Sequence, residues 1–344
     1  MLTLRRILHP TDCSACAEGA FAHAARLADR YDAELHILHV TDPPSGMLEG
    51  CFDDLRITPD DVATDLAALS PMSRSPAGSD RHASEPPAFI KVEVPGPDAA
   101  TGILRYAADY DVDLIVMGTH GRRGVRYLLM GSVAAEVVRR APCPVLTVPS
   151  AAVHSTPGSH APILVPVDFS DANREALAAA HLFAARFDAP VELLHVADDP
   201  VTYADAYANA HADAYADAHT SAPGLASGHE VDIGTRNNPL PRLRRFDRDV
   251  GSVPASRYHL REGRPEYEIA AAARRIGAGL IVMATHGRTG WTRVRLGSVT
   301  EQTLRRARCP VLSLGPEATR AVGASEARSF KTTLMPEARG YGAG

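Results

Sequence analysis

The stretch MGTHGRRGVRYLLMGSVAAEVVRRAPCPVLTV, residues 117–148, returns as MATHGRTGWTRVRLGSVTEQTLRRARCPVLSL at residues 283–314. Without a gap, 16 of these 32 positions are identical, at an offset of 166. Upstream, ILHPTDCS at 7–14 resembles ILVPVDFS at 163–170, at an offset of 156. Self-similarity of this extent predicts two homologous units in tandem, the second carrying a net ten extra residues.

The repeat divides the 344-residue chain into two units of ordinary domain size. We predict a first domain over 1–150, a linker over 151–161 and a second domain over 162–316, followed by a mobile tail over 317–344. The second domain carries an inserted low-complexity segment at 200–256. In it, Tyr or His recurs at every fourth position between 203 and 219, which we interpret as an Ala-rich helix rather than a metal-binding or partner-binding strip. Residues 221–256 are predicted to be loop.

The composition is typical of a folded globular protein, with 45% hydrophobic and 22% charged residues. A net charge of −5 offers no overall attraction to nucleic acid or to an anionic membrane. No apolar run approaches the roughly 18 residues of a membrane span, and the N-terminus lacks the pattern of a signal peptide. Five cysteines are too few for a disulfide framework. We therefore predict a cytoplasmic protein with no nucleic-acid or membrane partner.

Strand and helix patterns alternate in each half, which predicts parallel sheets covered by helices. Ligands of such sheets bind beyond the carboxyl ends of the strands. In the first half, the predicted strands are Arg6–His9, Leu35–Val40, Phe89–Val94, Leu114–Met117 and Pro144–Val148, and the predicted helices are Ser14–Tyr31, Gly102–Tyr110 and Ser132–Arg140.

A glycine motif follows the buried fourth strand of the first half. Gly118-x-x-Gly121 is followed, after nine intervening residues, by Gly131-Ser132 at the start of a helix. Glycine lets backbone N–H groups approach an anion closely, and a helix N-terminus adds free N–H groups and a positive dipole end. The motif is neither a Walker A loop nor a dinucleotide fingerprint. Recurring in both halves, it predicts phosphate binding.

The chain resembles the universal stress protein family, over both halves but not over the insertions and the tail. The family pattern G-x-x-G-x9-G-S/T is matched in full in the first half. The resemblance implies two doubly wound, Rossmann-like α/β domains, each a five-stranded parallel sheet of order 3-2-1-4-5. It also implies that ATP is the ligand, that Asp12 contacts the adenosine portion and that the backbone of Val40 reads adenine.

The second half matches with one departure, because Ala284 stands where the first glycine is expected. Since that residue ends a strand, we expect the extra methyl group to be tolerated. The predicted nucleotide-binding residues are Pro10, Thr11, Asp12, Val40, Gly118, His120, Gly121, Arg122, Gly131, Ser132 and Val133 in the first half, and Pro166, Val167, Asp168, Val196, Ala284, His286, Gly287, Arg288, Gly297, Ser298 and Val299 in the second. No metal ligands are predicted, and whether Mg²⁺ accompanies ATP is open.

In the family, the last strand pairs with another subunit or with the tandem domain. We therefore expect Cys143-Pro144-Val145 and Cys309-Pro310-Val311 to introduce strands that pair with each other, with both cysteines as packing residues. A homodimer and an unidentified protein partner stay open. The predicted function is that of a non-catalytic, nucleotide-responsive regulator of stress adaptation, in which nucleotide favours one arrangement of the loops 119–130 and 285–296.

Three alternatives stay open at this stage. Cys13 and Cys16 form a CxxC at a helix N-terminus, where a thiol can serve as a redox sensor or oxidoreductase. A slow ATPase is the second alternative, although the motif carboxylates Asp12 and Asp168 are assigned elsewhere by the resemblance. A dimerisation scaffold with empty pockets is the third.

Overall fold

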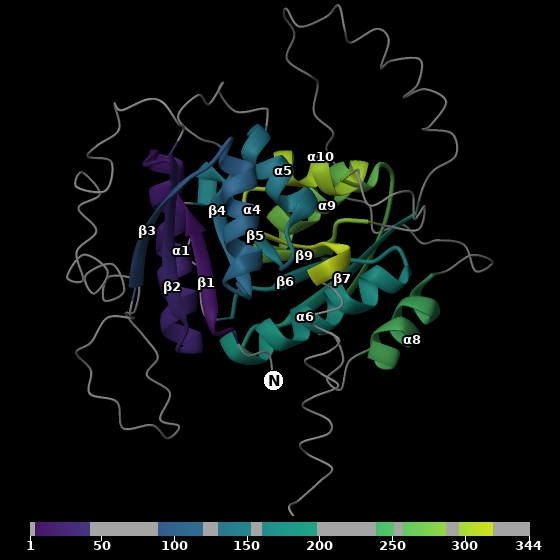
Figure 1. Ribbon diagram of the computed structural model, residues 1–344. Coiled ribbons are helices and arrows are strands. Elements are labelled where there is room, and N and C mark those ends of the chain that lie inside the picture. The colour runs from purple at the N-terminus through teal and green to yellow at the C-terminus, as the bar shows by residue number, and fades with distance from the viewer. Residues whose placement is uncertain are drawn as a thin grey trace, which may run out of the picture.

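The computed structural model describes residues 4–41, 89–119, 130–152, 160–197, 239–250, 257–286 and 296–318. Their strands form one sheet in the order β3-β2-β1-β4-β5-β10-β9-β6-β7-β8 (Figure 1). Each half, taken alone, has the predicted order 3-2-1-4-5 with parallel neighbours. The predicted α/β fold is confirmed, and the two five-stranded units are joined edge to edge.

The first half alternates strands and helices close to the predicted bounds. The largest shift is at α4, which begins at Ala99 rather than Gly102, because the Asp98 side chain caps the helix and accepts a hydrogen bond from the Thr101 amide at 2.9 Å. The elements are β1 (Arg6–Pro10), α1 (Ala15–Tyr31), β2 (Glu34–Thr41), β3 (Phe89–Pro95), α4 (Ala99–Asp109), β4 (Leu114–Gly118), α5 (Ser132–Arg140), β5 (Val145–Val148) and a 3₁₀ turn (Ser150–Ala152).

The second half repeats this order and adds a helix after β7. Its elements are β6 (Ile163–Pro166), α6 (Asp171–Phe187), β7 (Val191–Ala197), α8 (Leu240–Val250), β8 (Arg257–Glu262), α9 (Pro265–Ile276), β9 (Leu280–Ala284), α10 (Ser298–Arg306) and β10 (Val311–Leu314).

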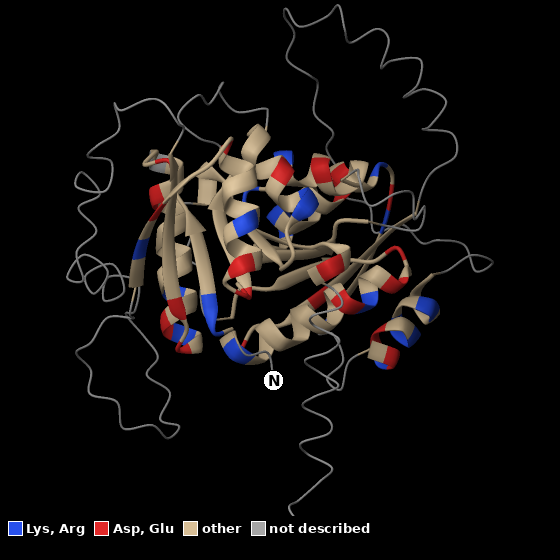
Figure 2. Ribbon diagram, viewed as in Figure 1, with Lys and Arg blue, Asp and Glu red and all other residues tan. Residues whose placement is uncertain are grey.

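Helix α8 corrects the prediction of loop for 221–256. It buries Leu243, Phe246 and Asp247, which repeat at the three-to-four-residue spacing of an amphipathic helix. Its other positions are mostly charged, as the mixed colours of α8 in Figure 2 show. The sequence analysis missed this helix because its apolar face is narrow and most of the residues around it are charged. The Tyr/His repeat at 203–219 lies outside the described residues.

The last strands of the two halves pair with each other, as predicted. Strand β10 runs antiparallel to β5, with Leu312 opposite Leu146. Across the same junction, the Thr147 hydroxyl donates to the Val311 carbonyl at 3.2 Å. Each of these strands therefore has a neighbour on both sides, and neither leaves an unpaired edge.

Helices cover both faces of the sheet. One apolar cluster joins α1, α6 and α8 to one face, and a second joins α4, α5, α9 and α10 to the other. In Figure 1, α6 and α8 lie below the sheet and α9 and α10 above it. Strands β1 and β4 are neighbours, yet the helices that follow them, α1 and α5, cover opposite faces. Such a reversal opens a crevice at the carboxyl ends of the strands, here once in each half. None of the described helices is both long and apolar enough to span a membrane.

Candidate nucleotide site

Each half makes a tight turn directly after its first strand. Cys13 in the first half and Phe169 in the second adopt positive φ angles of 60° and 65°. Left-handed backbone is uncommon for residues other than glycine. Its occurrence at equivalent positions, with unrelated side chains, shows that the turn geometry is a property of the repeated backbone.

The predicted acidic residues organise these turns. One carboxylate oxygen of Asp12 accepts a hydrogen bond from the Ser14 amide at 3.1 Å, and Asp168 does the same with the Ser170 amide at 2.8 Å. Both are Asx turns, in which the side chain hydrogen-bonds the backbone two residues ahead. The carboxylates are therefore held at the strand ends in the same way in both halves.

A histidine braces each turn from the neighbouring strand. Nδ1 of His39 on β2 donates to the Thr11 carbonyl at 2.9 Å, and Nδ1 of His195 on β7 donates to the Val167 carbonyl at 2.7 Å. These contacts connect the acidic turns to the strand that carries the predicted adenine-reading valines. The sequence analysis missed them, although the signal was present as His-Val in both halves.

The side chain of Val40 packs against two glycines. A Cβ atom on Gly96 would lie 2.9 Å from Cγ1 of Val40, and one on Gly102 would lie 2.7 Å from it. Both distances are shorter than real side chains permit. The absence of side chains at these two glycines therefore leaves room for the isopropyl group of Val40 beside α4. The Val40 peptide lies at the carboxyl end of β2.

Gly118 is required by close packing against α1. A Cβ atom there would lie 2.8 Å from Sγ and 3.0 Å from the carbonyl oxygen of Cys16. In the second half, Ala284 ends β9 as a buried residue, and the counterpart of Cys16 is the smaller Ala172. The structure thus accommodates the methyl group of Ala284 at the end of a strand.

The two ends of each glycine loop meet at a backbone hydrogen bond. The Gly131 amide donates to the Thr119 carbonyl at 2.8 Å, and the Gly297 amide donates to the Thr285 carbonyl at 2.9 Å. A Cβ atom on Gly297 would lie 2.8 Å from that Thr285 oxygen. Glycine is therefore needed at this position because two backbone segments approach each other there.

Helices α5 and α10 begin at these glycines. Neither Gly131 nor Gly297 has a side chain to cap its helix, and the next residues, Ser132 and Ser298, are exposed. Among the described residues, no side chain caps either helix start. The first amides of each helix, with the positive end of its dipole, are the kind of group that binds phosphate.

The predicted site residues divide into two groups. His120, Gly121, Arg122, Gly287 and Arg288 lie outside the described residues. The others lie at or beside the carboxyl ends of the strands: Pro10, Thr11, Asp12, Val40, Gly118, Gly131, Ser132, Val133, Pro166, Val167, Asp168, Val196, Ala284, His286, Gly297, Ser298 and Val299. In the part of the chain that is described, no group of three or more His, Cys, Asp or Glu is placed to hold a metal ion.

The two cysteines of the CxxC sequence are in different states. Cys13 is disulfide-bonded, whereas Cys16 is free, so the two are not bonded to each other. Burial raises the pKa of Cys143 and of Cys309 to about 12. These two thiols stay protonated at neutral pH, which agrees with the predicted role in packing.

The second crevice carries aromatic side chains that the first lacks at the same position. Phe169 lies 4.6 Å from the ring of His195 and 5.8 Å from Phe246 of α8, measured between ring centroids. The guanidinium of Arg242, also on α8, stands 4.0 Å from the centre of the Phe169 ring. Helix α8 therefore adds apolar and cationic groups beside Asp168 that sequence reasoning did not find.

The profile of the universal stress protein family matches residues 3–149 and again residues 160–314. The chain belongs to the universal stress protein family. As a tandem member, it is similar to a universal stress protein of Mycobacterium tuberculosis, with 31% identity over 205 residues. That match covers 59% of this chain and 61% of the relative, so the chain spans about three fifths of the first curated relatives it matches. A universal stress protein of Methanocaldococcus jannaschii is 32% identical over 148 residues, 42% of this chain and 81% of that protein.

Solved structures agree with the tandem fold. The crystal structure of a universal stress protein from Archaeoglobus fulgidus aligns with a TM-score of 0.59 and 19% identity, covering 90% of this chain and 97% of that one. A universal stress protein structure from Pseudomonas aeruginosa aligns with a TM-score of 0.58 and 16% identity, covering 94% and 98%. At these identities the likeness concerns the fold.

Proposed function

We propose that this universal stress protein binds ATP in both halves and acts as a nucleotide-responsive regulator rather than an enzyme. Family membership supports a role in stress responses. Nucleotide occupancy would alter the surface that each crevice offers to a protein partner, as a shift between arrangements of one protein. We propose that the protein acts in the cytoplasm.

The observation that carries the proposal is the backbone geometry at the two strand-to-helix junctions. In the second half, Gly297 stands so close to the Thr285 carbonyl that no side chain fits, and the helix start beyond it has no described cap. The first half repeats the hydrogen bond and the uncapped start at Gly131. Main-chain amides at such a junction suit the oxygens of a triphosphate.

The other end of each crevice suits an adenosine. The carboxylates of Asp12 and Asp168 are oriented by their own turns and can accept hydrogen bonds from ribose hydroxyls. The peptides of Val40 and Val196 can offer a donor and an acceptor to the adenine edge.

Equilibrium binding of labelled ATP to the full chain tests the proposal. We expect two sites for the native protein and one each for Gly131→Asp and Gly297→Asp, because a carboxylate at either helix start repels phosphate. Ala185→Asp is the matched control, since it adds the same charge at an exposed position on α6. It should bind two ATP molecules.

The stoichiometry decides the outcome. Two sites retained in both glycine variants, with folding verified by circular dichroism, would overturn the proposal. Release of inorganic phosphate is measured in the same samples with and without Mg²⁺. Turnover that disappears in both glycine variants would replace the regulator by an ATPase at the same sites.

A further inference from the structure

Helix α8 presents a row of exposed arginines on the second half. Its other exposed charge is a single carboxylate, that of Asp249. The second acidic residue of the helix, Asp247, is fully buried and accepts a hydrogen bond from the Tyr258 hydroxyl at 2.6 Å. The exposed side of α8 is therefore positively charged, and blue bands recur along this helix in Figure 2. Its exposed arginines are Arg242, Arg244, Arg245 and Arg248.

Aromatic rings lie beneath two of these arginines. The guanidinium of Arg242 lies 4.0 Å from the centre of the Phe169 ring. The guanidinium of Arg244 lies 5.7 Å from the centre of the Tyr258 ring. In the described part of the chain, neither arginine is paired with a carboxylate. Stacking restrains the plane of a guanidinium and leaves the N–H groups at its edge available, so less side-chain entropy is lost when an anion binds.

This arrangement continues onto α6. The guanidinium of Arg174 lies 5.0 Å from the centre of the Phe246 ring, and the centroids of Phe246 and Phe169 are 5.8 Å apart. Arg174 and Arg242 thus lie on two rings that contact each other. We call the surface formed by Arg174, Arg242 and Arg244 the α8 patch. Because Phe169 belongs to the turn after β6, the α8 patch lies beside the second crevice.

The repeat shows that the α8 patch is particular to the second half. At the offset of 156, the first half has Cys13 in place of Phe169 and Glu18 in place of Arg174. The charge at that point of the helix is therefore reversed between α1 and α6. A surface that differs in this way between two homologous domains is not needed for the fold that they share.

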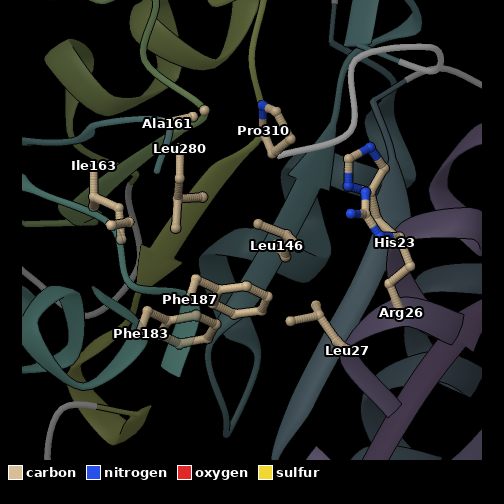
Figure 3. A pocket seen from close by; sticks show the side chains of 12 residues that line it. His23, Arg26, Leu27, Leu146, Ala161, Ile163, Phe183, Phe187, Leu280 and Pro310 are labelled. Carbon is tan, nitrogen blue, oxygen red and sulfur yellow. The ribbon is translucent and has the colours of Figure 1, made fainter. Parts of the chain in front are cut away.

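Enclosed space does not favour a small molecule as the ligand of this region. Figure 3 shows an apolar cavity between the two halves, lined among others by Arg26, Leu27, Leu146 and Phe183. Its accessible space is about 60 Å³, whereas pockets for drug-sized ligands begin at roughly 300 Å³. No residue of α8 lines it. The α8 patch is an open surface, which suits a macromolecular partner.

We propose that the α8 patch docks an acidic segment of a partner protein, rich in Asp and Glu. Charge complementarity selects this occupant, because a guanidinium can meet a carboxylate with two N–H groups. Arginines of this region already meet carboxylates of their own helices. Arg174 lies 3.6 Å from Asp171, and Arg245 lies 4.0 Å from Asp249.

The spacing of the arginines favours carboxylates over other anions. A single phosphate needs donors that converge on one point, whereas these arginines are spread along α8 and onto α6. Nucleic acid is a dense polyanion, which the net charge of −5 of the whole chain repels. The inference goes beyond the proposed function, because docking at this surface does not require ATP to bind.

Fluorescence anisotropy of a labelled decaglutamate peptide tests the proposal, without ATP and at two salt concentrations. The native full chain should bind this peptide saturably, more weakly at the higher salt, and should not bind a Gly-Ser peptide of the same length. Arg242→Gln and Arg244→Gln should each weaken binding by about threefold, and the two together by about tenfold. Arg105→Gln is the matched control, because it removes an exposed arginine of α4, outside the α8 patch. It should bind as the native protein does.

Arg242→Lys separates the stacked guanidinium from its charge. Lysine keeps the charge but lacks the planar fork, so this variant should recover only part of the affinity that Arg242→Gln loses. Thermal unfolding verifies that each variant folds. Absence of saturable binding, equal effects of Arg242→Gln and Arg105→Gln, or full affinity in Arg242→Lys would refute the docking site. Tighter binding of a labelled DNA duplex that is weakened by the same substitutions would also refute it, because the partner would then be a nucleic acid.

Discussion

The two halves of the chain build the same crevice from different side chains. After the first strand, one half has Cys13 and the other Phe169, yet both residues take the same left-handed backbone and both turns are closed by an aspartate. At the end of the fourth strand, one half has Gly118 against Cys16, and the other has Ala284 where the helix offers Ala172. The two halves therefore share their backbone geometry, and where a side chain differs between them, the side chain that contacts it differs as well.

The contact between α1 and α6 extends the comparison. The guanidinium of Arg30 donates to the Arg186 carbonyl, and that of Arg186 donates to the Arg30 carbonyl. These residues are equivalent at the offset of 156, so the two halves meet as the subunits of a symmetric dimer do. The repeat thus determines both the inside of each domain and the way in which the domains meet.

The largest expected effect concerns α8, which among the described residues belongs to the second half alone. Leu243 is fully buried between α8 and the rest of the fold. Leu243→Ala should lower the free energy of unfolding by about 3 kcal/mol through lost burial and a cavity. Urea denaturation measures this, with the exposed Arg245→Ala as control. A loss below that of the control would mean that α8 does not stabilise the second half.

The next effect is a dependence of the unfolding free energy on pH that arises from a buried histidine of the first half. His9 is buried against the Val116 carbonyl, which its Nδ1 meets at 2.9 Å, and burial lowers its pKa to about 4. The unfolded state binds a proton near pH 6.5, so stability is full above that pH and falls as the pH drops toward 4. The loss reaches about 3 kcal/mol, since each pKa unit is worth about 1.4 kcal/mol.

The second half has Val165 in place of this histidine. His9→Val should therefore reduce the dependence of the unfolding free energy on pH between 6.5 and 4, and the part due to His23, whose pKa burial also lowers to about 4, should remain. Urea unfolding of the variant and the native protein at several pH values measures the slopes. An unchanged slope would show that His9 does not carry the acid sensitivity.

A smaller effect is expected at the end of β4, where Gly118 and Cys16 of the first half correspond to Ala284 and Ala172 of the second. Gly118→Ala should destabilise the protein by about 1–2 kcal/mol, because its Cβ atom would crowd Cys16. Adding Cys16→Ala recreates the Ala284–Ala172 combination and should recover part of this loss. A double-mutant cycle measures the coupling. Additive effects of the two changes would show that the side chains do not compensate each other.

The smallest expected effect is at the symmetric contact. Arg186→Gln should cost about 1 kcal/mol or less, because its guanidinium is exposed. Arg30→Gln, the equivalent change in the first half, should cost about the same. Chemical denaturation of both variants measures the difference. A clear inequality would show that the junction between the halves is not symmetric in energy.

The regular elements could be predicted from the sequence because their apolar runs have a clear period. Strands β4 and β9, and helices α5 and α10 that begin directly after Gly131 and Gly297, lie where the repeat predicted them. Helix α8 was missed because a narrow apolar stripe among charges resembles loop. The sequence left a redox role of Cys13 and Cys16 open, and it did not reveal that Cys13 is disulfide-bonded while Cys16 is free, because sequence proximity does not determine which thiols are bonded.

The sequence by itself determined the tandem repeat and the order of its elements, because periodicity and repetition are local properties of the chain. The pairing of the last strands was predicted from the resemblance to the family. Only the tertiary structure decided that His39 and His195 brace the turns, that Gly118 makes room for Cys16, and that Arg26 lines a cavity between the halves. Those features depend on distances between residues that are far apart in the chain. Such distances are set when helices pack on the sheet, and no local pattern records them.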